Sequence, residues 1–222
     1  MIKAIIFDFD GTILDTETPE FSLISSIYQK YGKEFTLKLW EQTVGANSDI
    51  FCPYKHLEMM MSQKIDSNYV EQERQKKIDY IMKCNTPLPG VESYLEEARR
   101  LNLRIGLASS SKREWVVTHL ERLNLLPYFE CIVTSDDVEK VKPDPALYHK
   151  VVEQFKVKPE EVIAIEDSPN GVLAAKQAGL HLAIIPNKAT EKLKFDDSGI
   201  RLSSLEDMSL LNMMDHVLAC SR

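Results

Sequence analysis

Short apolar runs recur along the chain, with room for a helix between most of them. The runs cover residues 2–7, 103–108, 131–133, 162–165 and 181–185. Most are typical of buried parallel strands. Helical spacing of apolar positions lies between them, over residues 91–101, 114–123, 146–155 and 171–178. This alternation predicts an α/β fold with a Rossmann-like, doubly wound parallel sheet.

The segment after the first run departs from this rhythm. Residues 15–87 contain no β-rich run, and their apolar spacing predicts helices around residues 21–31, 51–61 and 70–82. A stiff link containing two prolines and a glycine follows at residues 86–90. We therefore expect an α-helical cap domain of residues 15–87, inserted into a core domain formed by residues 1–14 and 88–222.

Composition and charge narrow the classes of partner. The 222 residues are 44% hydrophobic and carry a formal net charge of −7. This charge argues against broad electrostatic binding to nucleic acid or to an anionic membrane. The first apolar run ends at Asp8, so it is too short for the apolar region of a secretory signal or for a membrane span. The cysteines form no CxxC pair. We expect a soluble, cytoplasmic monomer with reduced thiols.

Polar residues follow four of the apolar runs at the point where each run ends. They occupy residues 8–12, 109–111, 135–137 and 166–168. In open α/β sheets ligands bind at the carboxyl ends of the strands, so these four clusters should meet along one rim.

Asp8 and Asp10 are two residues apart, so in an extended chain they lean toward the same side. Two carboxylates this close repel unless a cation joins them. Oxygen ligands favour Mg²⁺, and Asp167 could join them from the fourth run. An Asp carboxylate can also attack phosphorus while a neighbouring acid protonates the leaving oxygen. The pair therefore predicts phosphoryl transfer.

Phosphoryl transfer also needs donors and positive charge aimed at the phosphate oxygens. Ser109, Ser110 and Lys142 are the candidates, and Pro143 and Pro145 stiffen the segment that presents the lysine. Taken singly, such motifs more often form turns, helix caps or solvated charges. Their occurrence together and in this order favours the functional interpretation.

These residues resemble the haloacid dehalogenase superfamily of phosphohydrolases, in the branch with a helical cap inserted after the first strand. Residues 8–12 resemble the first motif of the family, Ser109 the second, Lys142 the third and residues 165–171 the fourth. The resemblance spans nearly the whole chain, and such a set is highly specific.

The resemblance implies a role for each of these residues. Asp8 would be the nucleophile and Asp10 the general acid and base, while the serine and the lysine bind phosphate. Asp8, the backbone oxygen of Asp10 and Asp167 would hold Mg²⁺, with Glu166 in or next to the ligand shell. The cap would close over the site and select a small phosphorylated metabolite.

A β-phosphoglucomutase-like enzyme is the nearest alternative. Those mutases carry a histidine and an arginine on the cap, where this chain has Glu20 and Ser48. We therefore expect hydrolysis, with Glu20 and Asn47 binding the neutral end of a sugar phosphate. A shifted alignment would instead let Lys55 or His56 supply positive charge.

A phospho-accepting signalling domain is the alternative from another class, because such domains also group acids, a hydroxyl and a lysine on an α/β rim. The helical insertion, the chain length and Asp10 argue against it. Nucleotide-binding motifs of the GxGxxG and GxxxxGK[ST] types are absent from the sequence.

Overall fold

The computed structural model describes residues 1–45, 51–196 and 199–220. Within them lies a six-stranded sheet with the order β3-β2-β1-β4-β5-β6, in which every neighbouring pair is parallel. The strands are β1 (Ala4–Phe7), β2 (Arg104–Ala108), β3 (Cys131–Val133), β4 (Val162–Glu166), β5 (His181–Ile184) and β6 (Ile200–Arg201). The predicted doubly wound parallel sheet is confirmed. The apolar pattern did not predict the two-residue strand β6.

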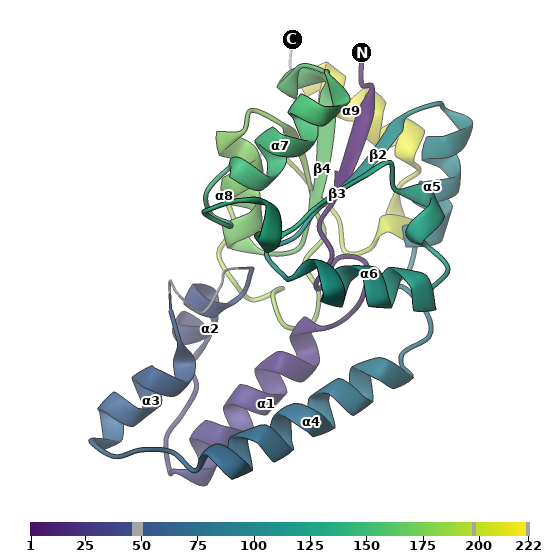
Figure 1. Cartoon of the computed structure of the whole chain (residues 1–222). Helices are drawn as coiled ribbons and strands as arrows, with labels where there is room; N and C mark the ends of the chain where they lie inside the picture. The colour runs from purple at the N-terminus through teal and green to yellow at the C-terminus, as the bar shows by residue number, and fades with distance from the viewer. Residues whose placement is uncertain (46–50, 197–198, 221–222) are drawn as a thin grey trace.

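Helices cover both faces of the sheet (Figure 1). One face packs against α5 (Val91–Arg100), α6 (Arg113–Arg122) and α9 (Leu210–Cys220), and the other against α7 (Ala146–Phe155) and α8 (Pro169–Gln177). Short 3₁₀ helices lie at Leu126–Tyr128, Ser135–Asp137, Pro159–Glu161 and Leu205–Asp207. The predicted helices of the core are present with ends shifted by at most two residues, and α9 is additional.

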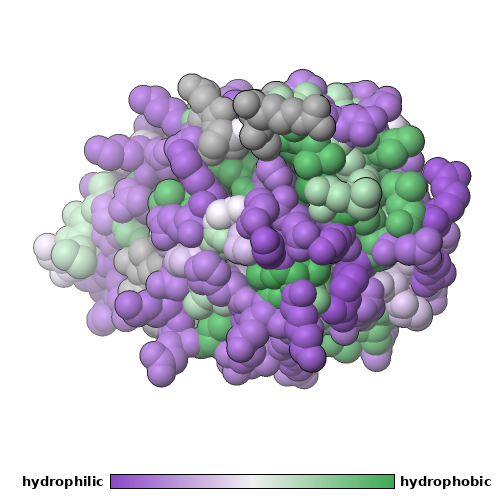
Figure 2. All heavy atoms as spheres, turned by 90° about the horizontal axis from the view of Figure 1, so that it is seen from above, coloured by the Kyte–Doolittle hydropathy of each residue, from purple (hydrophilic) through white to green (hydrophobic). Residues whose placement is uncertain are grey.

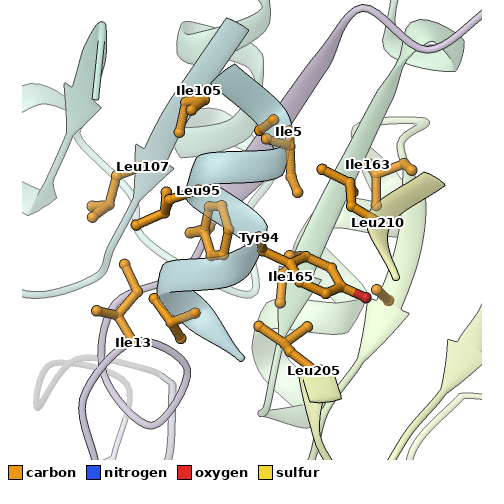
Figure 3. Close-up of a cluster of buried hydrophobic side chains, with 14 of the residues drawn as sticks. Ile5, Ile13, Tyr94, Leu95, Ile105, Leu107, Ile163, Ile165, Leu205 and Leu210 are labelled. Atoms are coloured by element: carbon orange, nitrogen blue, oxygen red, sulfur yellow. The ribbon is translucent and has the colours of Figure 1, made fainter. Parts of the chain in front are cut away.

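The central strand β1 supplies side chains to both layers because successive residues of a strand point to opposite faces. Ile5 and Phe7 join the cluster under α5, while Ala4 and Ile6 join the cluster under α7 and α8. In Figure 3, Tyr94 and Leu95 of α5 lie over the side chains from the neighbouring strands. This two-sided burial fixes the sheet and therefore the position of its carboxyl rim.

A helical cap is inserted after β1, at the end of the molecule away from the chain termini (Figure 1). It contains α1 (Glu17–Lys30), α2 (Leu37–Thr43), α3 (Pro53–Met61) and α4 (Ser67–Lys83), and α1 packs along α4. The sequence predicted α1, α3 and α4 but not α2. The domain limits at residues 15 and 87 stay a prediction.

The cap has its own hydrophobic cluster, and part of it comes from the core domain. Trp40 of α2 is fully buried, and its indole N–H donates to the carbonyl oxygen of Ala189 at 2.8 Å. Ala189 and Leu193 of the core belong to this same cap cluster. The Asn170 amide donates to the Val44 carbonyl at 2.7 Å. The end of α2 is therefore anchored to the core.

The surface opposite the cap is mainly hydrophilic, with small groups of hydrophobic side chains between the polar ones (Figure 2). Among the described residues, no helix combines the length and the apolar character needed to cross a membrane.

Candidate active site

The site lies next to β1, at the point where the order of the strands in the sheet reverses. The chain moves outward from β1 to β2 and β3 and then returns to β4 on the other side of β1. Asp8 follows β1, Glu166 ends β4, and the Asp8 amide donates to the Ile165 carbonyl at 3.0 Å. In doubly wound sheets this switch point forms the ligand crevice. The predicted convergence of the acids after these two strands is therefore observed.

Asp8 lies against a buried lysine. The Lys142 ammonium donates to the Asp8 carboxylate and also contacts Glu166, with 2.7 Å between Nζ and Oε1. Burial raises the pKa of Asp8 to about 8, although Lys142 opposes this effect. Burial would lower the pKa of Lys142, but the carboxylates of Asp8 and Glu166 outweigh it and raise that pKa. The lysine therefore stays charged beside Asp8.

Asp167 completes a buried group of acids. One ligand atom each from Asp8, Glu166 and Asp167 lies within 4.8 Å of the others. Burial first, and then the charges of Asp8 and Glu166, raise the pKa of Asp167 well above its ordinary value. The Asn187 amide donates to Asp167 Oδ2 at 2.7 Å, and the Thr12 hydroxyl to Oδ1 at 3.3 Å. Such a cluster of hard oxygen ligands fits a metal site.

Two glycines allow this close packing. Gly11 has a φ of +79°, and a Cβ there would lie 2.4 Å from Asp167 Oδ2. At Gly171 a Cβ would lie 1.9 Å from a Glu166 oxygen. Both contacts are far below normal van der Waals distance, so these backbone positions must lack a side chain for the carboxylates to take their places.

The Asp10 carboxylate lies outside this acidic group and among hydrogen-bond donors. It accepts from the hydroxyls of Ser109, Ser111 and Thr16 and from the Trp115 indole N–H. The Asp10 side chain is therefore held by four hydrogen bonds and is not part of the candidate metal-ligand group among the described residues. Metal binding by its backbone oxygen stays a prediction.

A cleft of about 620 Å³ lies between the cap and the core. Asp8, Asp10, Ser110 and Ser111 line it from the core. Ser110 also donates to the Gly45 carbonyl at 3.0 Å, so its hydroxyl faces the cap. Ser109 is fully buried behind this wall. Of the sequence-predicted residues of the core, Asp8, Asp10 and Ser110 therefore line the cleft, while Lys142, Glu166 and Asp167 lie buried beneath Asp8 and do not line it.

The cap wall of the cleft carries charge of both signs. Glu20 lines it from α1 and forms an ion pair with Lys77 of α4, while its role in substrate binding stays a prediction. Arg74, one turn earlier on α4, lies 4.9 Å from the centre of the Tyr54 ring. Helix α4 therefore supplies two cations, Arg74 and Lys77, that the comparison of Glu20 and Ser48 with the mutases did not consider.

Two of the other cap residues named by the sequence, Lys55 and His56, are not among the described residues that line this cleft. Asn47 and Ser48 lie outside the described residues. Lys55 is exposed, and His56 Nδ1 shares a hydrogen bond of 3.0 Å with the Tyr28 hydroxyl. Neither Lys55 nor His56 supplies the positive charge considered for the cap.

Several residues of the site carried no sequence signal. Trp115, Asn187 and Tyr148 reach it from parts of the chain without a recognised motif, and the Tyr148 hydroxyl donates to Glu166 at 2.5 Å. Glu17 is the fourth, a cleft-lining acid whose pKa is raised well above its ordinary value by burial and then by Asp167. Glu17 lies five residues after the end of the polar motif at residues 8–12, so proximity in sequence could have indicated it.

Comparison with known proteins agrees with this geometry. Residues 5–185 match the family of haloacid dehalogenase-like hydrolases. The YhcW protein of Bacillus subtilis, assigned as a phosphatase, is 43% identical over 98% of each chain. A phosphorylated carbohydrates phosphatase of Thermotoga maritima is 31% identical over 98% of this chain and 100% of its own. The β-phosphoglucomutase of Bacillus subtilis is 32% identical over 81% of each chain.

The chain belongs to the haloacid dehalogenase-like hydrolases. Within that family it is a phosphatase of the branch with a helical cap after the first strand, a phosphoric monoester hydrolase.

Proposed function

We propose that this enzyme hydrolyses small sugar phosphates in the presence of Mg²⁺, through a phosphorylated Asp8. One observation carries the proposal. Asp8 lies buried at the switch point against the charged Lys142, and the candidate acid Asp10 lines the same cleft. This arrangement provides a nucleophile, a counter-charge for the phosphate and a proton donor in one cavity.

The first step forms a bond from an Asp8 carboxylate oxygen to phosphorus and breaks the bond from phosphorus to the sugar oxygen. Asp10 gives its proton to that leaving oxygen. Lys142 and Ser109 stabilise the phosphoryl oxygens while charge shifts among them. In the second step Asp10 removes a proton from water, which attacks phosphorus and frees Asp8.

Asp8 and Asp167 are the residues that would hold Mg²⁺. Burial first, and then the charges of neighbouring acids, raise the pKa values of both residues, and a divalent cation would offset this cost of ionisation. When bound, the ion supplies positive charge to the phosphoryl oxygens. Glu166 already accepts hydrogen bonds from Tyr148 and Ser168 and pairs with Lys142. We therefore assign it to holding Lys142 rather than to direct ligation.

The cap wall supports a sugar as the remainder of the substrate. Glu20 and Lys77 offer an acceptor and a donor, and the Tyr54 hydroxyl, next to Arg74, lines the same wall. Hydroxyl groups of a sugar could satisfy all three, since each hydroxyl both donates and accepts. The relative from Thermotoga maritima is named for acting on phosphorylated carbohydrates, which agrees with this choice.

A phosphosugar mutase is the second candidate, because Arg74 and Lys77 line the cap side of the cleft. A mutase must bind a second phosphate on that side while its bisphosphate intermediate reorients in the site. Glu20 offsets the charge of Lys77, and the Arg74 guanidinium lies by the Tyr54 ring. This wall is less suited to a second phosphate than to neutral hydroxyl groups, so hydrolysis is the function we favour.

The test compares both reactions in one mixture. Purified enzyme is incubated with Mg²⁺, β-glucose 1-phosphate and a catalytic amount of glucose 1,6-bisphosphate, and free phosphate and glucose 6-phosphate are followed together. A parallel panel holds other sugar phosphates, phosphoglycolate and nucleoside monophosphates, each with and without chelator. We expect free phosphate to form faster, and only with the metal. Faster formation of glucose 6-phosphate would identify a mutase, and full activity in chelator would exclude the metal dependence.

A further inference from the structure

The hydrogen bonds to Asp10 divide between its two carboxylate oxygens. Oδ1 accepts from the Thr16 hydroxyl and from the Trp115 indole N–H, both at 2.9 Å. Oδ2 accepts from the hydroxyls of Ser111 at 2.5 Å and Ser109 at 3.4 Å. An ionised carboxylate offers about four lone-pair sites, so this carboxylate is fully occupied. Asp10 can carry a proton for the leaving group only when one of these lone-pair sites becomes free.

The donors differ in what else they can do. A hydroxyl can rotate toward another acceptor, whereas an indole N–H is fixed in the ring plane and can only donate. The Trp115 ring is itself held in place, because it packs edge-on against buried His119 at a centroid distance of 4.2 Å. His119 in turn stacks on Phe9 at 6.1 Å. The indole N–H is therefore the donor to Asp10 with the least freedom to leave.

The hydrogen bond from Ser109 to Oδ2 of Asp10 can break when phosphate binds. Ser109 is the proposed phosphate ligand, and its hydroxyl would turn from Asp10 Oδ2 toward a phosphoryl oxygen. That leaves Oδ2 able to carry a proton, while Oδ1 keeps its bonds to Thr16 and Trp115. The two oxygens of Asp10 would thus have different tasks, one anchored and one reactive.

We propose that Trp115 is a positioning residue for the general acid, whose indole N–H holds Oδ1 of Asp10 so that Oδ2 faces the leaving oxygen. The inference rests on the proposed role of Asp10. It concerns the step in which the bond from phosphorus to the leaving oxygen breaks and the Asp10 proton moves to that oxygen. The effect should therefore depend on how much the leaving group needs a proton.

The substitution Trp115→Phe removes the N–H and keeps an aromatic ring against His119. The measured quantity is kcat/KM, which covers the steps up to release of the leaving group and excludes the later hydrolysis of phosphorylated Asp8. For the best sugar phosphate, whose alkoxide leaves poorly without a proton, we expect a loss of about tenfold. For p-nitrophenyl phosphate, whose phenolate leaves readily unprotonated, the loss should stay below about twofold.

The ratio of the two kcat/KM values is the deciding readout, because both come from one preparation and the fraction of active enzyme cancels. Tyr94→Phe is the matched control, since it removes a buried aromatic hydrogen bond, to the Met208 carbonyl at 2.6 Å, in the hydrophobic core. It should leave the ratio unchanged. Equal losses on both substrates in Trp115→Phe, or no loss on either, would overturn the inference.

Asp10→Asn separates this inference from the proposed function. Like Trp115→Phe, it should lose more kcat/KM on the sugar phosphate than on p-nitrophenyl phosphate, and the difference should be larger. We call this difference between the two losses the leaving-group bias. A leaving-group bias in Asp10→Asn but not in Trp115→Phe would refute the role of Trp115 and leave Asp10 as the acid. Absence of bias in Asp10→Asn would refute the acid itself, and with it the proposal for Trp115.

Discussion

Single residues of the site place charge where a folded protein normally avoids it. Asp8, Lys142, Glu166 and Asp167 are all nearly inaccessible to solvent. A buried charge is costly unless it is paired, and here three acids share one lysine. The arrangement therefore lacks positive charge. This deficit is a property of the site itself, and it leads to a prediction about metal binding that does not require turnover.

Mg²⁺ should stabilise the folded protein through Asp167. A ligand that binds only the folded state raises its stability, by about 2.7 kcal/mol at a hundredfold excess over Kd, which corresponds to roughly 5 °C or more in Tm for a chain of this size. Thermal unfolding with Mg²⁺ and with chelator measures the shift. Asp167→Asn should lose most of it, whereas the matched control Asp79→Asn, on the exposed side of α4, should keep it. A full shift in Asp167→Asn would contradict the assignment.

His119 should make stability depend on pH. Burial, followed by the charge of Arg122, lowers its pKa below the ordinary value of 6.5. The Arg122 guanidinium also donates to Nδ1 at 2.8 Å, which favours the neutral ring. Between pH 6.5 and this lowered pKa, His119 therefore binds a proton more readily in the unfolded chain than in the folded chain. This contribution to stability is complete above pH 6.5 and is lost as the pH falls toward the lowered pKa.

The substitution His119→Gln removes this proton linkage. Urea unfolding at about pH 7.5 and about pH 5.5 gives the two free energies of unfolding. The variant should lose less stability between them than the wild type does. His216→Gln, at an exposed position of α9, is the control and should keep the wild-type difference. An unchanged difference in His119→Gln would refute the linkage.

At the scale of elements, α2 is the part of the cap that fastens it to the core. Its C-terminal end meets the core at Trp40 and Val44, through the hydrogen bonds to Ala189 and from Asn170. The opposite side of the cap, α4, instead supplies cations to the cleft. The short helix that the sequence did not predict therefore has the clearest structural task in the cap.

Trp40→Phe should weaken this anchor. The substitution keeps most of the ring but leaves the buried Ala189 carbonyl without its donor, which costs about 1 to 2 kcal/mol of unfolding free energy. Equilibrium urea unfolding measures the change. Tyr80→Phe, at an exposed ring on α4, should change stability by less than about 0.5 kcal/mol. A loss in Trp40→Phe no larger than in this control would show that the anchor contributes little.

The strands and long helices were predictable because each carries a local pattern. The five longer strands are continuous apolar runs, and α7 shows its helical spacing over the same residues in sequence and structure. By contrast, β6 has two residues and α2 has one buried residue, Trp40. Elements this short carry too little pattern, and their partners lie far away along the chain. The helix α9 follows the last of the apolar runs, beyond the alternation of strands and helices from which the other helices were predicted.

The site was predictable to the extent that its residues follow strands. Asp8, Asp10 and Asp167 have fixed places at the carboxyl ends of β1 and β4, and parallel pairing brings them together. Trp115 and Asn187 reach the same acids across 105 and 20 positions, respectively. Their contacts depend on how separate elements pack, which short spacing does not encode. The cations that α4 contributes to the cap wall, Arg74 and Lys77, were not predicted for the same reason.

The whole molecule combines a net charge of −7 with a cleft that carries charge of both signs. Arg74, Lys77 and Lys112 line the cleft together with four acids, and Lys142 lies buried against Asp8. Electrostatic attraction of a phosphorylated substrate therefore depends on these local cations and not on the overall charge. The remaining acidic surface should also keep copies of the chain apart.

We expect the protein to be a monomer in solution. Light scattering during size-exclusion chromatography should give a mass near 25.4 kDa across a range of protein concentrations. Twice that mass, persisting on dilution, would contradict the expectation and would identify an interface that the acidic surface does not predict.

Replacement of Asp8 by asparagine tests the central claim, that Asp8 is the nucleophile of a phosphatase, most directly. The amide is nearly the same size but a far poorer nucleophile, so kcat/KM for the best sugar phosphate should fall by at least about a thousandfold. Asp79→Asn, prepared in the same way, controls for the substitution and for contaminating phosphatases. Thermal unfolding should show that Asp8→Asn remains folded. A folded Asp8→Asn variant with activity within about tenfold of the wild type would contradict the account.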